Sequence, residues 1–206
     1  MDWSKHALLV IDVQNDFLND IPDIDTFQTS IQRLLRFCRA RKILVVHIRS
    51  FFNACGSDWM VFAKIRGSSP CVRGTAGSMS PEWAQPLITE VVLEKRRFDA
   101  FLDTDLYRVL ERHGIRHIFV CGLVTSICVN ITALSAMQRG FVTTVLSDCV
   151  SDDADEHERT LRYYGEFAYG VIHSGSIEHE YERIESDIRT VDYQASRVPN
   201  DACTEN

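Results

Sequence analysis

The sequence predicts an α/β fold, a single domain with a doubly wound (Rossmann-like), mostly parallel sheet of about six strands and helices on both faces. Short apolar runs alternate with helical repeats along most of the chain. Continuous apolar runs are typical of parallel strands whose two faces are both covered by helices. The 206 residues, 45% of them hydrophobic and 25% charged, suffice for one domain with a full-sized core over residues 1–206.

Six apolar runs are the predicted strands. They cover residues 7–11, 43–46, 91–93, 118–120, 142–146 and 167–172. A helix is predicted between residues 27 and 38, where apolar side chains recur on one face. A second helix is predicted over residues 106–110, between a Thr104 cap and a Gly114 stop. Because such sheets bind ligands beyond the carboxyl ends of their strands, the functional residues are expected there.

Two segments depart from this alternation. Residues 50–88 contain several glycines and prolines among scattered aromatic residues, and a connection of that length is typical of a lid or binding loop. A C-terminal helix is predicted over about residues 177–190. Its apolar stripe consists of Ile177, Tyr181, Ile184 and Ile188. We expect this stripe to pack on the core, with a subunit contact as the alternative, and a polar tail over about residues 194–206.

Composition excludes several classes of function. The formal net charge of −7 argues against nucleic acid as the main partner. No apolar run approaches the roughly 20 residues that span a bilayer, and the N-terminal residues lack the regions of a signal peptide. A cytoplasmic protein without a membrane partner is therefore expected. Seven cysteines with no tight pairing pattern argue against a disulfide framework, so most should be reduced.

One of these cysteines, Cys128, stands where an apolar strand gives way to a helix-forming run. The first turn of a helix presents free backbone N–H groups and the positive end of its dipole, which favours thiolate over thiol and supplies donors for an oxyanion. Cys128 is therefore a candidate nucleophile. The other cysteines are expected to be small buried hydrophobic residues.

Two further reactive side chains follow predicted strands. Asp12 ends the first strand and Lys95 follows the third, so both could meet Cys128 at one edge of the sheet. A thiolate attacks a carbonyl carbon, a carboxylate takes the thiol proton and returns it to a leaving amine, and an ammonium holds both charges. The three residues form a candidate Cys-Asp-Lys triad. Asp16 is expected to make local hydrogen bonds rather than act as a second base.

Four segments in this order resemble the isochorismatase-like cysteine hydrolases, which include nicotinamidases, N-carbamoylsarcosine amidases, and ureidoacrylate and biuret hydrolases. They are residues 9–17 (LVIDVQNDF), 73–77 (RGTAG), 95–101 (KRRFDAF) and 122–129 (GLVTSICV). The resemblance covers about residues 6–172. It implies a doubly wound α/β hydrolase that acts on carbon–nitrogen bonds other than peptide bonds.

The resemblance also implies a role for each side chain. Cys128 would be the nucleophile that forms a thioester, Asp12 the general base and then the general acid, and Lys95 the electrostatic partner of both. A cis peptide bond is implied at Leu123–Val124, which would aim the Val124 N–H beside that of Cys128 as an oxyanion hole. Relatives form dimers and larger assemblies, so a homo-oligomer, a dimer or tetramer, is expected.

No metal and no other cofactor is expected. Some members of this family hold a metal through an Asp-x-His pair and a further histidine after the second strand. Here that region contains one histidine, His47, inside the predicted strand and no Asp-x-His pair. The other histidines are dispersed without ligand spacing. A metal-dependent nicotinamidase is therefore disfavoured.

The expected substrate is a small amide, ureide or N-carbamoyl compound. Arginines near the mapped site could bind a substrate carboxylate or be structural, and aromatic residues could wall the pocket or pack in the core. The candidates are Phe17, Phe52, Trp59, Arg73, Arg97 and Thr125, with Arg96 as a further arginine. The sequence does not distinguish among these arginines.

Three functions remain open. The first is a metal-independent cysteine amidohydrolase that works through a Cys128 thioester. The second is a hydrolase of the isochorismatase type, which cleaves a vinyl ether with Asp12 as the acid and has no need of a thiol. The third is a binding or scaffold protein that has lost catalysis. A cysteine at position 128 favours the first.

Overall fold

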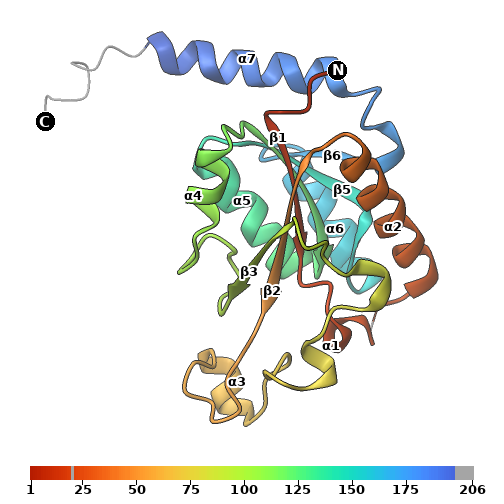
Figure 1. Cartoon of the computed structure of the whole chain (residues 1–206), viewed down its shortest axis with the longest axis vertical. Helices are drawn as coiled ribbons and strands as arrows, with labels where there is room; N and C mark the ends of the chain where they lie inside the picture. Colours follow the sequence, from red (N-terminus) through yellow and green to blue (C-terminus); the bar gives the residue numbers. More distant parts are fainter. Residues whose placement is uncertain (20, 198–206) are drawn as a thin grey trace, which may run out of the picture.

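Six strands form one parallel sheet in the order β3-β2-β1-β4-β5-β6 in the computed structural model, which describes residues 1–19 and 21–197 (Figure 1). The strands are β1 (His6–Ile11), β2 (Leu44–Ser50), β3 (Val91–Lys95), β4 (His117–Leu123), β5 (Val142–Ser151) and β6 (Gly170–Ile172). The helices are α1 (Asn15–Leu18), α2 (Ile24–Ala40), α3 (Val61–Arg66), α4 (Leu106–Arg112), α5 (Asn130–Gln138), α6 (Ala154–Gly165) and α7 (Tyr181–Arg197). The predicted fold class is confirmed.

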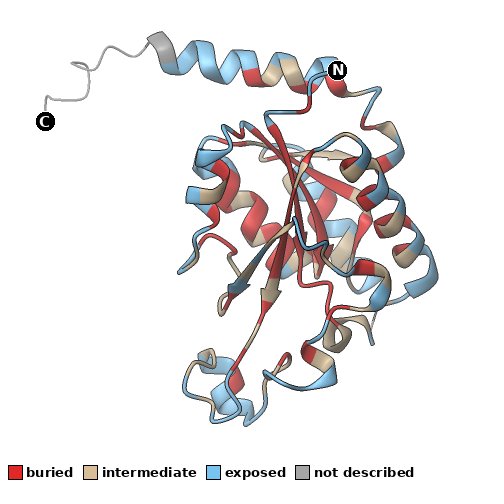
Figure 2. Cartoon of the chain, in the orientation of Figure 1, coloured by how far each residue is buried: buried red, intermediate tan, exposed pale blue. Residues whose placement is uncertain are grey.

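Helices cover both faces of the sheet, and the central strand β1 shows how the sequence directs this. Leu8 and Val10 face a core cluster shared with α2 and α7, whereas Ala7, Leu9 and Ile11 face a cluster shared with α4, α5 and α6. The strands are therefore buried on both sides, while the outer faces of the helices are exposed (Figure 2). Within residues 1–19 and 21–197, none of the helices has the length and apolar character needed to cross a membrane.

The strand order reverses at the centre of the sheet, between β1 and β4. Gly122, near the carboxyl end of β4, allows the two strands to approach closely there. Its φ is +116°, and a Cβ at this position would lie 1.9 Å from the carbonyl oxygen of Ile11. The carboxyl ends of β1 and β4 therefore flank the crevice in which doubly wound sheets bind ligands.

All six strands differ from their predicted bounds, and two of them show the physical reason. The strand predicted over residues 167–172 begins only at Gly170, because the N–H groups of residues 167–169 turn back to the carbonyl of Tyr164 at the end of α6. The second strand, by contrast, continues to Ser50 because ladder hydrogen bonds extend past its apolar run. This extension carries a polar side chain to the carboxyl edge of the sheet.

Helix α7 packs across the amino ends of the strands, close to the N-terminus (Figure 1). It begins later than predicted, at Tyr181, and continues to Arg197, so the predicted polar tail lies outside the described residues from position 198 onward. The apolar stripe is buried at Ile177, Tyr181, Ile184 and Ile188. The Tyr181 hydroxyl accepts the Asp2 N–H at 2.9 Å. The stripe therefore packs on the core.

Two buried histidines lie beneath α7. His6 Nδ1 is 3.2 Å from His117 Nδ1, and His6 Nε2 is 3.0 Å from Glu185 Oε1 on α7. His117 Nε2 is 2.9 Å from Thr144 Oγ1. Burial lowers the pKa of His6, against the opposing effect of Glu185. Burial, and then the charge of His6, lower the pKa of His117 well below its ordinary value.

Replacing Ile184 with Ala should test the contact of α7 with the core. Ile184 is fully buried, so the substitution should reduce the free energy of unfolding by about 2–5 kcal/mol through lost burial and a residual cavity. Urea denaturation measures this change. Val191→Ala, on the exposed part of the same helix, should change it by less than about 0.5 kcal/mol. Equal effects of the two substitutions would contradict the packing described.

The buried histidines should make stability fall in mild acid. An unfolded histidine binds a proton near pH 6.5, whereas folded His117 resists protonation because its pKa is lowered. The unfolded state therefore binds more protons below about pH 6.5, and the free energy of unfolding falls by up to about 1.4 kcal/mol per pH unit for this group. Urea titrations between pH 7.5 and 5.5 should show this slope. His117→Gln should flatten it, whereas His113→Gln, on the surface, should leave it unchanged.

Candidate active site

Three reactive side chains meet at the carboxyl edge of the sheet, and they are the three that the sequence selects. Lys95 Nζ lies 2.6 Å from Asp12 Oδ2 and 3.4 Å from Cys128 Sγ. Asp12 and Lys95 are at most 1% exposed, and Cys128 is 8% exposed. A carboxylate, an ammonium and a thiol thus share one site that is almost closed to water.

Each of these side chains is placed by the end of a strand. Asp12 directly follows β1, and its N–H donates to the carbonyl of Ile48 at 2.8 Å. Its φ of +51° lies in the left-handed region, which aspartate tolerates better than most residues. Lys95 is the last residue of β3. Cys128 lies in a π-helical turn (Thr125–Val129) between β4 and α5.

Two polar residues that the sequence analysis did not select hold Asp12 in place. Ser50 donates to Asp12 Oδ1 from its hydroxyl at 2.9 Å and from its backbone N–H at 3.0 Å, and it accepts from Lys95 Nζ at 3.1 Å. The Gln14 side chain donates to the Ser50 carbonyl and accepts its N–H, both at 2.8 Å. The sequence could have indicated Ser50, because this residue follows the second apolar run and so lies at the same sheet edge as Asp12 and Lys95.

The electrostatics of the site correct one expectation. The helix terminus was expected to favour thiolate at Cys128, but burial, and then the Asp12 carboxylate, raise the pKa of this thiol well above its ordinary value. Lys95 opposes the rise only in part. Burial lowers the pKa of Lys95, but Asp12 and Cys128 raise it by more, so its net pKa is raised. The resting site therefore holds a thiol beside an ammonium.

The peptide bond between Leu123 and Val124 is cis. The Val124 carbonyl accepts the N–H groups of Ile127 and Val129 at 3.2 and 3.3 Å, which closes the turn that carries Cys128. Asp152 accepts both the N–H and the hydroxyl of Ser126, at 2.8 and 2.6 Å. The turn is therefore anchored at both its start and its interior.

A cavity of about 500 Å³ opens onto Cys128 and Lys95. Its walls are largely apolar and include four aromatic residues, Phe17, Phe52, Phe62 and Phe98. Val124 and Cys128, the predicted oxyanion-hole residues, both line it. Part of the wall comes from residues 60–70, inside the connection predicted to be a lid or binding loop. Two of the predicted aromatic residues, Phe17 and Phe52, thus lie at the cavity.

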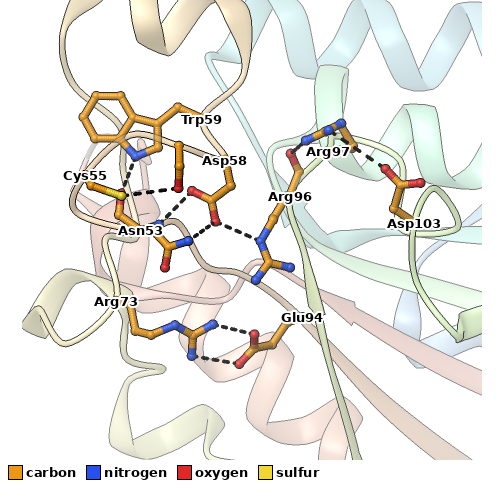
Figure 3. Close-up of polar contacts among 10 residues, drawn as sticks. Asn53, Cys55, Asp58, Trp59, Arg73, Glu94, Arg96, Arg97 and Asp103 are labelled. Atoms are coloured by element: carbon orange, nitrogen blue, oxygen red, sulfur yellow. Dashed lines mark hydrogen bonds and ion pairs between the residues drawn. The ribbon is translucent and has the colours of Figure 1, made fainter.

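The other predicted substrate-binding residues lie away from the lining of this cavity. They are Trp59, Arg73, Arg97 and Thr125. Thr125 is fully buried, and its hydroxyl is 2.9 Å from His157 Nδ1. The Trp59 indole N–H donates to the Asn53 carbonyl at 2.8 Å within its own loop (Figure 3).

The arginines selected from the sequence have protein partners (Figure 3). Arg73 forms a two-pronged ion pair with Glu94, at 3.1 and 2.6 Å. Arg96 Nε donates to Asp58 Oδ2 at 2.9 Å. Arg97 donates to the Arg96 carbonyl at 2.9 Å and lies 3.9 Å from Asp103. Since each guanidinium meets a carboxylate of the chain, these arginines tie the loops around the site together.

His47, the histidine considered as a metal ligand, also has a hydrogen-bond partner within the chain. His47 is buried in β2, and its Nε2 lies 3.0 Å from Glu90 Oε2, which also pairs with Arg39. Among residues 1–19 and 21–197, no group of three or more histidine, cysteine, aspartate or glutamate side chains could hold a metal ion. The residues present do not fit the metal site that some relatives have. The Asp16 carboxylate was expected to bond locally, but it accepts the N–H of Cys71, which is 55 residues away in the sequence, at 2.6 Å.

Comparisons with known proteins agree with this architecture. The Isochorismatase domain model matches residues 6–169. An uncharacterised isochorismatase family protein of Bacillus subtilis, YwoC, is 31% identical, over 79% of this chain and 87% of the relative. A maleamate amidohydrolase of Pseudomonas putida is also 31% identical, over 76% and 78%. The crystal structure of N-carbamoylsarcosine amidase from Thermoplasma acidophilum superimposes with a TM-score of 0.71, with 26% identity, covering 82% of this chain and 96% of that one.

Replacing Asp12 with Asn should lower the pKa of the Cys128 thiol. The carboxylate is the second cause of the raised pKa, and its removal leaves Lys95 as the nearest charge to sulfur. The pH profile of Cys128 alkylation by iodoacetamide, followed by peptide mass spectrometry, should therefore move to lower pH. Lys95→Met should move it to higher pH. The exposed Cys55 serves as the internal reference, and a profile that is the same in both variants would contradict this account.

Proposed function

Because the chain belongs to the isochorismatase family of hydrolases, we propose that it is a metal-independent cysteine amidohydrolase. Its substrate would be a small amide, ureide or N-carbamoyl compound, cleaved at a carbon–nitrogen bond. The observation that carries the proposal is the contact of Lys95 with both Asp12 and Cys128 beside a cavity of about 500 Å³. A thiol, a base and a fixed positive charge are the groups that acyl transfer requires.

In the first half of the reaction, Cys128 Sγ attacks the carbonyl carbon while its proton passes to Asp12. The tetrahedral intermediate places its negative oxygen toward the N–H groups of Val124 and Cys128. Asp12 then returns the proton to the leaving nitrogen, the carbon–nitrogen bond breaks, and ammonia or an amine departs. A thioester on Cys128 remains. Water, deprotonated by Asp12, hydrolyses it to the acid and restores the thiol.

Lys95 makes this proton transfer feasible inside a buried site. When the thiol proton moves to Asp12, the negative charge moves from the carboxylate to sulfur. Both atoms contact the same ammonium, at 2.6 and 3.4 Å, so the charge stays compensated throughout. The raised pKa of Lys95 keeps that ammonium charged. Positive charge held in place before the reaction needs no reorganisation during it.

The raised pKa of Cys128 supports the role of Asp12 as a base. A thiol that stays protonated at neutral pH cannot attack by itself, because the thiolate is the nucleophile. An adjacent carboxylate that removes the proton as attack begins resolves this difficulty. The vinyl-ether mechanism would need Asp12 as the acid but gives Cys128 no role. A scaffold protein would need only the fold, and it also gives Cys128 no role.

Intact-mass spectrometry should detect the thioester. After rapid mixing with a panel of amides, ureides and N-carbamoyl compounds, followed by acid quenching, one or more compounds should add an acyl group that maps to Cys128. Cys128→Ala should abolish the adduct and reduce ammonia release by on the order of 10⁴-fold or more.

Cys55→Ser is the matched control for nonspecific acylation. Cys55 is exposed, and hydrogen bonding with Ser57 lowers its pKa, so among the six cysteines of residues 1–19 and 21–197 it is the thiol most open to chemical acylation. Adduct and turnover should survive this change. Ammonia release that persists in both Cys128→Ala and Cys128→Ser would refute the proposal, and isochorismate turnover that persists in them would favour the vinyl-ether mechanism.

A further inference from the structure

We infer that Arg66 binds a carboxylate of the substrate, so that the preferred substrates are amides or N-carbamoyl compounds that carry a carboxylate. This inference rests on the proposed function, and it narrows the class of substrate. It concerns a residue on α3, in the loop that completes the cavity, which the sequence did not single out.

The charges around the cavity carry the first step. Lys95 and Arg66 are the two charged residues that line it, and no acidic side chain does. Lys95 is already engaged by Asp12, the Ser50 hydroxyl and the Arg97 carbonyl, at 2.6, 3.1 and 3.0 Å. Arg66, by contrast, has no ion pair and no side-chain hydrogen bond within residues 1–19 and 21–197. An anion that enters this cavity therefore meets one uncompensated guanidinium.

Aromatic contacts keep that guanidinium at the wall of the cavity. The Arg66 guanidinium carbon lies 5.6 Å from the centre of the Phe62 ring, within the range of a cation–π contact. The Phe62 ring in turn stacks on Phe98, with centroids 5.7 Å apart and planes at 21°. Both rings line the cavity. Since Phe98 lies three residues after Lys95, the stack links Arg66 to the catalytic edge of the sheet.

Hydrogen bonds fix the segment that precedes α3, and this supports the position of Arg66 at the cavity (Figure 3). Asp58 accepts the N–H and the side-chain amide of Asn53, both at 2.9 Å, and also Arg96 from the segment after β3. This network holds the chain at Asp58, three residues before α3 begins at Val61. Helix α3 therefore starts from an anchored point, although it extends beyond the carboxyl end of β2 (Figure 1).

The other arginines near the site are not available to bind a substrate carboxylate, which leaves Arg66. Arg73, Arg96 and Arg97 each face a carboxylate of the chain, as Figure 3 shows, and none lines the cavity. A guanidinium binds carboxylate through two parallel N–H groups, so a guanidinium without a protein partner in the cavity that also holds the Cys128 thiol selects for that group. A substrate with its amide carbonyl at Cys128 and its carboxylate at Arg66 would use both ends of the same cavity.

The test compares substrates that differ only in charge. N-carbamoyl amino acids and monoamides of dicarboxylic acids are each assayed against their methyl esters. The carboxylate should be preferred in kcat/KM by about tenfold, through a lower KM. Arg66→Gln should reduce this ratio to near one. Lys64→Gln removes the same charge from the same helix at a residue off the cavity, and it should preserve the ratio.

A binding measurement separates this inference from the proposed function. Calorimetry with Cys128→Ala requires no turnover, so it remains informative even where no thioester forms. The carboxylate should again bind about tenfold more tightly than its ester, and this difference should vanish in the Arg66→Gln, Cys128→Ala double variant. Equal binding of acid and ester, or a preference that survives the loss of Arg66, overturns the inference. Absence of the thioester alone overturns only the amidohydrolase.

Discussion

The buried ion pair between Lys95 and Asp12 is the constraint on which the rest of the site depends. Removing an ammonium and a carboxylate from water costs several kcal/mol per ion, and their attraction offsets this only with close geometry and satisfied hydrogen bonds. Lys95 Nζ and Asp12 Oδ2 are 2.6 Å apart, and the Ser50 hydroxyl accepts from Lys95 Nζ and donates to the other carboxylate oxygen, Asp12 Oδ1. Ser50 is paired with Lys95 in the register of β2 and β3. The parallel register of three neighbouring strands is therefore what makes the charges tolerable.

The same burial determines the state of the sulfur. Cys128 lies at the start of a helical segment, a position that by itself lowers the pKa of a thiol. Burial and the Asp12 carboxylate outweigh that effect, so the pKa is raised instead. Under the proposed mechanism this is useful, because thiolate forms only when a carbonyl is present to receive it. The ion pair supplies the base and also the compensating charge.

The sequence was sufficient for the fold and for the meeting of Asp12, Lys95 and Cys128 at one edge of the sheet, but it did not reveal the surroundings of these residues. Asp12, Lys95 and Cys128 follow strands, and the carboxyl ends of parallel strands share one edge, so their meeting is a consequence of topology. The contacts of Arg73 and Arg66 depend on how residues 50–88 return to the sheet, which no local pattern encodes. Both are arginines in the same connection, yet one faces Glu94 and the other faces the cavity. The protonation state of the Cys128 thiol differs from the expectation for a related reason. The start of a helix can be predicted from local sequence, whereas burial of the thiol depends on the whole fold.

The contrast between Cys55 and Cys128 separates chemical reactivity from catalytic function. Cys55 is exposed and has a lowered pKa, so it has more thiolate at neutral pH than an ordinary cysteine. Its side-chain hydrogen-bond partner is the Ser57 hydroxyl, and the nearby Asp58 carboxylate is held by Asn53 and Arg96. Cys128 has less thiolate at rest, but its sulfur lies 3.4 Å from Lys95 Nζ, and Lys95 also contacts the Asp12 carboxylate at 2.6 Å. Transition-state stabilisation depends on that arrangement rather than on the resting fraction of thiolate. Under the proposed mechanism, a low thiol pKa alone would therefore select the wrong cysteine in this chain.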